Sequence, residues 1–213
     1  DILAGSGTIA ANAGTNSDYR AANGSGGRIA VYYSDDQSTI LNTLGTASPK
    51  ITAQSTGGMG QWSPKPSGAG TIYIENKIND VPKQGSLFVR NLGDNTTTQR
   101  AAIVQANEVG ISEFVFKQIT LTNAGHLDVV GQTSTITLTQ GDKLTGDATT
   151  PRLSAFGTFK YTGEDTLVIS GADVAIRGKL ELVNGYDVVV GGSIAGKLTL
   201  YANTWYYNDI NNY

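Results

Sequence analysis

The stretch Thr166–Leu200, TLVISGADVAIRGKLELVNGYDVVVGGSIAGKLTL, repeats one small unit in which apolar residues alternate with other residues and Gly or Asn closes the unit. Because side chains alternate between the two faces of a β-strand, each apolar pair marks one face of a short strand. Short strands with glycine corners and no room for helices predict a solenoid. The pairs are Leu167 with Ile169, Val174 with Ile176, Leu180 with Leu182, Val188 with Val190, and Leu198 with Leu200.

The middle of the chain carries the same alternation with a measurable period. Ile119, Leu127, Ile136 and Leu144 follow one another at steps of eight, nine and eight positions. Three such steps return the chain to its starting face, so we expect three faces and about 25 residues in each coil. The composition agrees with this, since 27 glycines supply corners and only 15% of the residues are charged.

The first third of the chain holds three glycine-rich segments that resemble one another. They are GSGTIAANAG (5–14), GSGGRIAVYYSD (24–35) and GAGTIYIEN (68–76). Their first apolar positions, together with that of a fourth strand-like segment, are evenly spaced along the chain, at Ile9, Ile29, Ile51 and Ile72. This spacing, about 21 residues from one isoleucine to the next, predicts one coil of a parallel β-helix for each interval.

These segments resemble the glycine-rich parallel β-helix repeats of bacterial secreted or surface adhesin-like proteins. The resemblance extends from Gly5 to about Asn76, a third of the chain, and implies an exposed location and a structural or adhesive role. It brings no catalytic residues with it.

The expected fold is therefore all-β: a single-stranded parallel β-helix, or β-solenoid, with extended loops over residues 1–200. A β-sandwich of jelly-roll order, with antiparallel strands, is the alternative. Residues 201–213 are expected to form a separate aromatic tail. Ala101–Glu108 fits a short helix or a strand, and Asp142–Arg152 is the best candidate for a boundary, although we do not expect it to separate two cores.

Charge and hydropathy restrict the partners. A net charge of −3 with scattered charges argues against nucleic acid, and no apolar run is long enough to span a membrane. The chain has no cysteine and begins at Asp1 without a basic-apolar leader. We therefore expect a secreted or cell-surface protein.

The residues that could perform chemistry are scattered. His126 is the only histidine, so a triad or zinc site that needs two is excluded. Acidic residues in turns could hold Ca²⁺, but no spacing indicates a catalytic pair, and we predict no enzyme and no other cofactor. Thr133, Thr135, Thr137 and Thr139, with Thr120 and Thr122 beside them, could form a flat ice-binding ladder. The acids considered are Asp35, Asp36, Glu75, Asp80, Asp142, Asp147, Glu164, Asp165 and Asp187.

Aromatic residues are the best candidates for contact surfaces. Trp62 lies on a Pro-rich loop, and five aromatic residues fall in the tail YANTWYYNDINNY. These side chains are expected to cap the solenoid or to contact a neighbouring molecule. The predicted assembly residues are Trp62, Tyr201, Trp205, Tyr206, Tyr207 and Tyr213.

The predicted function is that of an extracellular structural protein, which self-assembles into a fibre or coat or acts as an adhesin. A carbohydrate-binding module, with Trp62, Tyr32, Tyr33 or the tail stacking on sugar rings, is the second hypothesis. A polysaccharide-degrading β-helix enzyme is the third.

Overall fold

The computed structural model describes residues 1–13, 25–54, 68–91, 101–105, 113–184, 187–192, 194–201 and 205–208, and gives only the backbone of 101–105, 142 and 205–208. Within these ranges the chain is all-β. It forms twenty-one strands, the short 3₁₀ turns η1 (Leu41–Thr43) and η3 (Gly141–Lys143), and no α-helix.

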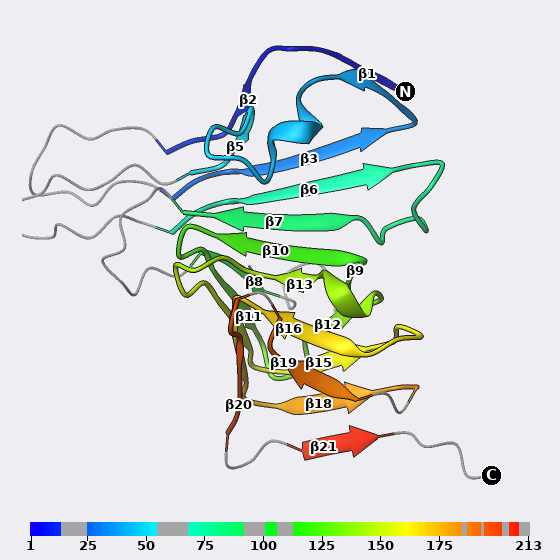
Figure 1. Ribbon diagram of the computed structural model, residues 1–213, viewed down its shortest axis with the longest axis vertical. Coiled ribbons are helices and arrows are strands. Elements are labelled where there is room, and N and C mark those ends of the chain that lie inside the picture. Colours follow the sequence, from blue (N-terminus) through cyan, green and yellow to red (C-terminus); the bar gives the residue numbers. More distant parts are fainter. Residues whose placement is uncertain are drawn as a thin grey trace, which may run out of the picture.

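From β7 onward the chain passes through three parallel sheets in turn, and it makes this circuit five times (Figure 1). We call this part the C-terminal unit (residues 86–208). The first sheet contains β7 (Ser86–Arg90), β10 (Gln118–Thr122), β13 (Leu144–Thr145), β16 (Leu167–Ser170) and β19 (Val188–Val190). The second contains β8 (Ala101–Gln105), β11 (His126–Val130), β14 (Arg152–Ala155), β17 (Asp173–Ile176) and β20 (Lys197–Leu200). The third contains β9 (Glu113–Phe116), β12 (Thr135–Leu138), β15 (Thr158–Tyr161), β18 (Lys179–Leu182) and β21 (Trp205–Asn208).

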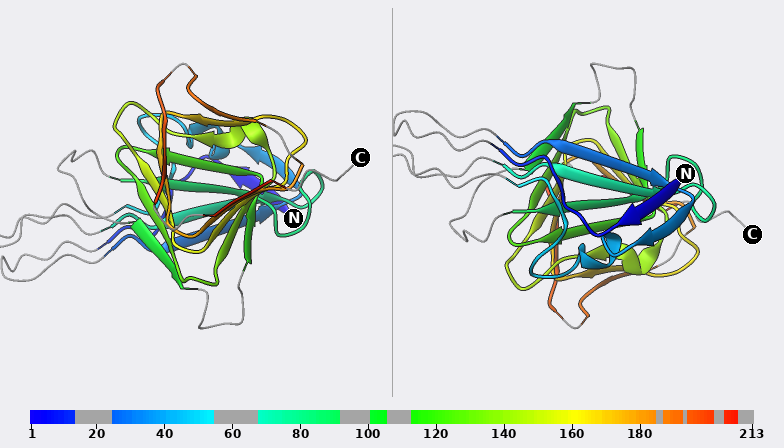
Figure 2. Two further views of the ribbon diagram at one scale, coloured as in Figure 1. Left: turned by 90° about the horizontal axis from the view of Figure 1, so that it is seen from below. Right: turned by 90° about the horizontal axis from the view of Figure 1, so that it is seen from above.

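The register of these sheets confirms the period predicted for the middle of the chain. Ile119 pairs with Leu144, and Leu144 pairs with Ile169. Leu127 and Ile136 lie between them on the second and third sheets. Seen along the stack, successive circuits lie over one another (Figure 2).

Alternate side chains of each strand fill the space that the three sheets enclose. The apolar pairs of β16, β17 and β18 are all buried there. A corner between the second and third sheets shows why glycine is required. A Cβ on Gly178 would lie 2.1 Å from the carbonyl oxygen of Gly157 in the circuit before it. The same oxygen accepts the Lys179 N–H at 3.0 Å, so the chains cannot separate at this corner without losing a hydrogen bond.

The chain before β7 forms a smaller N-terminal unit of two circuits, from β1 to β6. The first circuit is β1 (Ile2–Gly5), β2 (Ile9–Ala10) and β3 (Arg28–Tyr33), and the second is β4 (Asp35–Ser38), β5 (Ile51–Thr52) and β6 (Thr71–Asn76). Each strand pairs in parallel with its counterpart in the other circuit.

The predicted coil length, one circuit for each interval between the four isoleucines, is wrong for this unit. Ile9 pairs with Ile51 and Ile29 pairs with Ile72, so a full circuit spans two of these intervals. The four isoleucines alternate between two sheets, and the single interval measures the step from one sheet to the next.

The two units share one sheet but have separate cores. β6 and β7 pair antiparallel, with Ile72 opposite Phe88 and Tyr73 opposite Leu87, and this joins β3 and β6 to the first sheet. Residues directly opposite each other in such a pair point to the same side. Ile72 and Phe88 pack into the N-terminal core, whereas Leu87 belongs to the C-terminal core.

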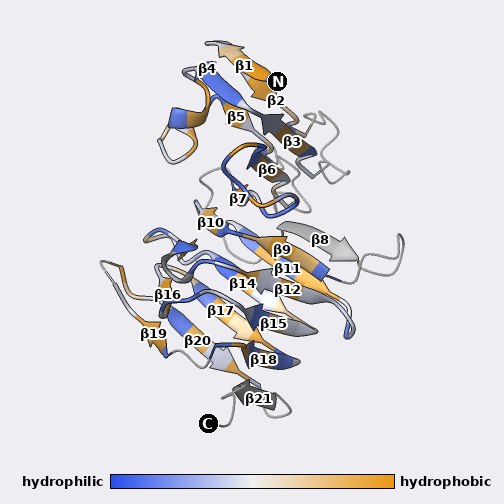
Figure 3. Ribbon diagram, turned by 90° about the vertical axis from the view of Figure 1, so that its right-hand side faces the viewer, coloured by the Kyte–Doolittle hydropathy of each residue, from blue (hydrophilic) through white to orange (hydrophobic). Residues whose placement is uncertain are grey.

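The cores therefore lie on opposite sides of the shared sheet. In Figure 3, β4 and β5 lie to the left of β3 and β6, while β8, β9 and β12 lie to the right of β7 and β10. At the junction the strand direction reverses, and so does the side of the sheet on which the core lies. These two reversals cancel, so both units wind with the same handedness.

Two open predictions are decided by this arrangement. β8 makes Ala101–Gln105 a strand rather than a helix. Leu144 and Leu153 belong to one buried cluster, so Asp142–Arg152 does not separate two cores. Of the sixteen strand pairings among the described residues only β6 with β7 is antiparallel, which does not fit the β-sandwich alternative.

Candidate functional site

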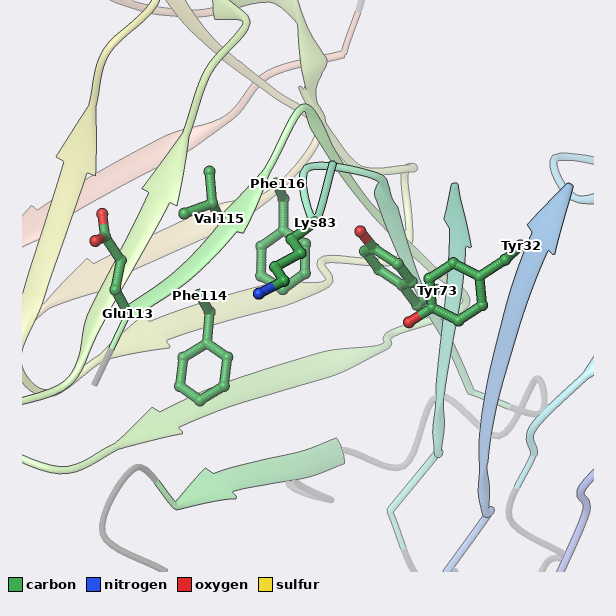
Figure 4. Close-up of a pocket in the computed structure, with 7 residues that line it drawn as sticks. All are labelled: Tyr32, Tyr73, Lys83, Glu113, Phe114, Val115 and Phe116. Carbon is green, nitrogen blue, oxygen red and sulfur yellow. The ribbon is translucent and has the colours of Figure 1, made fainter. Parts of the chain in front are cut away.

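The candidate site is a pocket of about 320 Å³ at the junction between the two units (Figure 4). The N-terminal core lies on the opposite side of the shared sheet from the C-terminal core. The N-terminal unit therefore does not cover the end of the C-terminal core that is formed by the first circuit, β7 to β9. The reverse side of β3 and β6 forms one wall of the pocket, and β9 forms the other. The lining residues are Tyr32, Tyr73, Lys83, Glu113, Phe114, Val115 and Phe116.

Aromatic rings make most of the apolar surface. Tyr32 and Tyr73 have ring centroids 5.8 Å apart at an interplanar angle of 57°, and Tyr73 meets Phe116 edge-on at 6.3 Å. Tyr32 is 51% exposed. Phe114 and Phe116 pair with the inward-facing residues of β12 and pack against the C-terminal core.

Hydrogen bonds hold the Tyr73 ring in place. Its hydroxyl donates to Glu75 Oε2 at 2.6 Å and accepts the Gly85 N–H at 2.7 Å. Glu75 Oε2 also accepts the Lys83 N–H at 3.1 Å. Burial, and then the hydrogen bond to Glu75, raise the pKa of Tyr73 well above its usual value, so the ring remains a neutral phenol.

The loop between β6 and β7 is fixed by a buried acid. The side chain of Asp80 is only 3% exposed, pairs with the Lys117 ammonium group, and accepts the Asn76 N–H at 2.8 Å. The Lys117 N–H donates to the Gly85 carbonyl at 3.0 Å. These contacts hold the segment that carries Lys83 beside the C-terminal end of β9.

One edge of β9 lines the pocket. β9 pairs in parallel with β12 on one side, and no described strand pairs with its other edge. Glu113 and Val115 alternate along the strand with Phe114 and Phe116, and all four line the pocket. Residues from both faces of a strand can line one pocket only if that pocket runs over the edge of the strand.

The predicted assembly residues are not part of this pocket. Tyr201 lies at the last described corner of the stack, where its ring centroid is 4.1 Å from the Arg177 guanidinium carbon. Its hydroxyl accepts from Arg152 at 3.3 Å and from Arg177 at 3.2 Å. Trp205, Tyr206 and Tyr207 belong to β21, which adds a strand to the third sheet. Trp62 and Tyr213 lie outside the described residues.

The two tyrosines proposed for sugar binding point in opposite directions. Tyr32 lines the pocket, whereas Tyr33 packs against the N-terminal core. Sequence reasoning therefore identified one residue of this site. Tyr73, Phe114 and Phe116 were missed because the strands that bring them together, β6 and β9, are distant in the sequence.

The structure gives several predicted acids a local structural role. Their carboxylates accept backbone N–H groups at strand ends or in the connections between strands. No cluster of three or more His, Cys, Asp or Glu residues suited to a metal ion occurs within the described ranges. The acceptors and donors are Asp36 with Ser38 at 2.9 Å, Asp147 with Asn123 at 2.7 Å, and Asp165 with Gly141 at 3.0 Å.

The flat threonine ladder is not formed. Thr137 is buried, and its hydroxyl donates to Glu113 Oε1 at 2.9 Å. Thr120 and Thr122 belong to β10 in the first sheet, whereas Thr135 and Thr137 belong to β12 in the third.

A second notable surface lies at the other end of the C-terminal unit. The inward-facing residues of the last circuit include Val188, Val190, Leu198 and Leu200, which continue the rows of buried side chains above them. Val190 is 43% exposed and Leu200 is 45% exposed, so the described residues leave this end of the core uncovered.

The comparisons with known proteins give no assignment. No family model matches the chain, and neither the curated proteins nor the solved structures contain a significant match. Among the described residues, no helix has the length and hydropathy needed to cross a membrane.

Proposed function

We propose that this chain is a β-solenoid with a structural, non-enzymatic role in a secreted or cell-surface protein, and that it self-associates through its C-terminal end. The parallel circuits and the continuous buried rows support the solenoid assignment. The low charge and the many corner residues support an exposed structural role.

The main evidence for self-association is the uncovered end of the C-terminal core, at the last circuit. Val188, Val190, Leu198 and Leu200 point into the stack but have no further circuit to pack against among the described residues. No strand of the described ranges pairs with the outer edges of β19 and β20 there. Apolar surface next to open strand edges favours association with another strand layer.

The junction between the two units restricts how two copies can stack. In a head-to-tail stack, β19 of one copy would take the position next to β7 of the other, and β6 already occupies that position. A tail-to-tail pair around a two-fold axis brings the two uncovered ends together without this clash. We therefore propose a closed dimer rather than an open fibre.

Sedimentation velocity over a concentration series tests this proposal. The wild-type protein is expected to form a dimer, and Val190→Lys combined with Leu200→Lys is expected to shift it to monomer. Ile78→Lys is the matched control, because Ile78 is 71% exposed and lies far from this end. A wild-type protein that remains monomeric at high concentration, or fibres in electron micrographs, would contradict the closed dimer.

A further inference from the structure

We propose that the pocket between β9 and the Tyr32–Tyr73 wall binds an extended peptide, which adds to the free edge of β9 as a parallel strand. This function is separate from self-association, which uses the other end of the molecule.

The pocket lies where the third sheet begins. In each later circuit, one edge of the strand in the third sheet is covered by the strand of the circuit before it. β9 has no such cover among the described residues, and the pocket lies along its open edge. An added strand would satisfy the free backbone groups of β9, and backbone pairing of this kind is a common mode of peptide recognition.

The side chains of the pocket form two facing apolar walls. Phe114 and Phe116 point toward the core side of β9, and Tyr73 and Tyr32 face them across the pocket (Figure 4). A bound strand would place every second side chain among these rings. The peptide is therefore expected to be apolar at alternate positions.

The two ends of the pocket carry opposite charges, from Glu113 and Lys83. Glu113 opens β9, while the segment that carries Lys83 lies beside its C-terminal end, where the Lys117 N–H meets the Gly85 carbonyl. A parallel peptide would bring its N-terminal part to Glu113 and its C-terminal part to Lys83. The pocket therefore fits a peptide with a basic residue at its start and an acidic residue at its end.

The probe is the capped peptide Lys-Val-Thr-Val-Thr-Val-Glu, with binding measured by fluorescence anisotropy. Binding is expected, and Tyr32→Ala is expected to weaken it at least fivefold because the peptide loses part of its apolar wall. Ile78→Ala is the control, since Ile78 is exposed but does not line the pocket. Exchanging the terminal Lys and Glu is expected to weaken binding as well.

Two N-methylated versions of the peptide, methylated at odd or at even positions, test the pairing itself. Only alternate residues of an added strand bond to its neighbour, so one version is expected to lose binding and the other to keep it. Equal affinities for both versions, or no binding of the unmodified peptide at millimolar concentration, would overturn the proposal. Tyr32-dependent binding of cellohexaose or chitohexaose without peptide binding would overturn it in favour of a sugar site.

Discussion

The two units are built from similar alternating strands, but they differ in how tightly the chain winds. From β10 onward, one circuit of the C-terminal unit returns Ile119 to Leu144, whereas one circuit of the N-terminal unit runs all the way from Ile9 to Ile51. Among the described residues, the buried cluster of the C-terminal unit is also several times larger than that of the N-terminal unit. Tight winding places more of the chain in the core, so we infer that most of the stability lies in the C-terminal unit.

The largest expected effect comes from truncating the same side chain in each core. Ile136→Ala should lower the free energy of unfolding by roughly 3–5 kcal/mol, because Ile136 is fully buried in the longer stack. Ile51→Ala should cost about 2 kcal/mol, because the smaller core can relax around the cavity. Urea unfolding measures both values.

Hydrogen exchange then locates the damage. Ile51→Ala should speed exchange in β2, β5 and β6 and leave β11 to β18 protected. Equal loss of protection in both units would show that they unfold together, contrary to our comparison.

A smaller effect is expected at the corners. Gly178→Ala should destabilise the protein by about 1–3 kcal/mol, since the new methyl group would overlap the Gly157 carbonyl of the adjacent circuit. Gly45→Ala is the matched change in the N-terminal unit, where a Cβ meets no atom within 4 Å, and it should be neutral or slightly stabilising. Thermal unfolding of both variants tests this; similar losses would mean that close stacking does not restrict Gly178.

The smallest effect on stability is expected from Tyr73, which lines the pocket. Tyr73→Phe should cost about 1 kcal/mol at neutral pH, because it removes the hydrogen bonds to Glu75 and from Gly85. The raised pKa of Tyr73 means that its contribution is complete below the unfolded pKa, near 10, and is lost as the pH rises toward the folded pKa.

The stability difference between wild type and Tyr73→Phe should therefore shrink above about pH 10. Urea unfolding at several alkaline pH values measures it. A difference that stays constant or grows with pH would contradict the burial of the phenol.

From β10 onward, the sequence predicted the C-terminal unit well because the connections between its strands are short. Because the strands in Thr166–Leu200 follow one another so closely, the alternation leaves few ways to arrange the chain. Each of its apolar pairs lies within one strand, from β16 to β20. In the N-terminal unit, much longer connections follow β2, β4 and β5. The interval between Ile9 and Ile29 therefore did not reveal which strands pair.

The junction and the pocket could not be predicted from local patterns. TIYIEN and SLFVR alternate like the other strands, and nothing in either segment marks an antiparallel pair. Tyr32 is adjacent to Tyr33 in an alternating strand, which predicts opposite faces but not which face meets a pocket. That assignment depends on the side of the shared sheet on which each core forms.

The most direct test of this two-core arrangement is an NMR measurement of the Phe88 ring. Nuclear Overhauser effects are expected between the Phe88 ring protons and the methyl groups of Ile72 and Ile51 in the N-terminal core, while Val89 methyl groups contact Leu121. Contacts of the Phe88 ring with Leu121 or Val129 instead would place it in the C-terminal core and contradict the account.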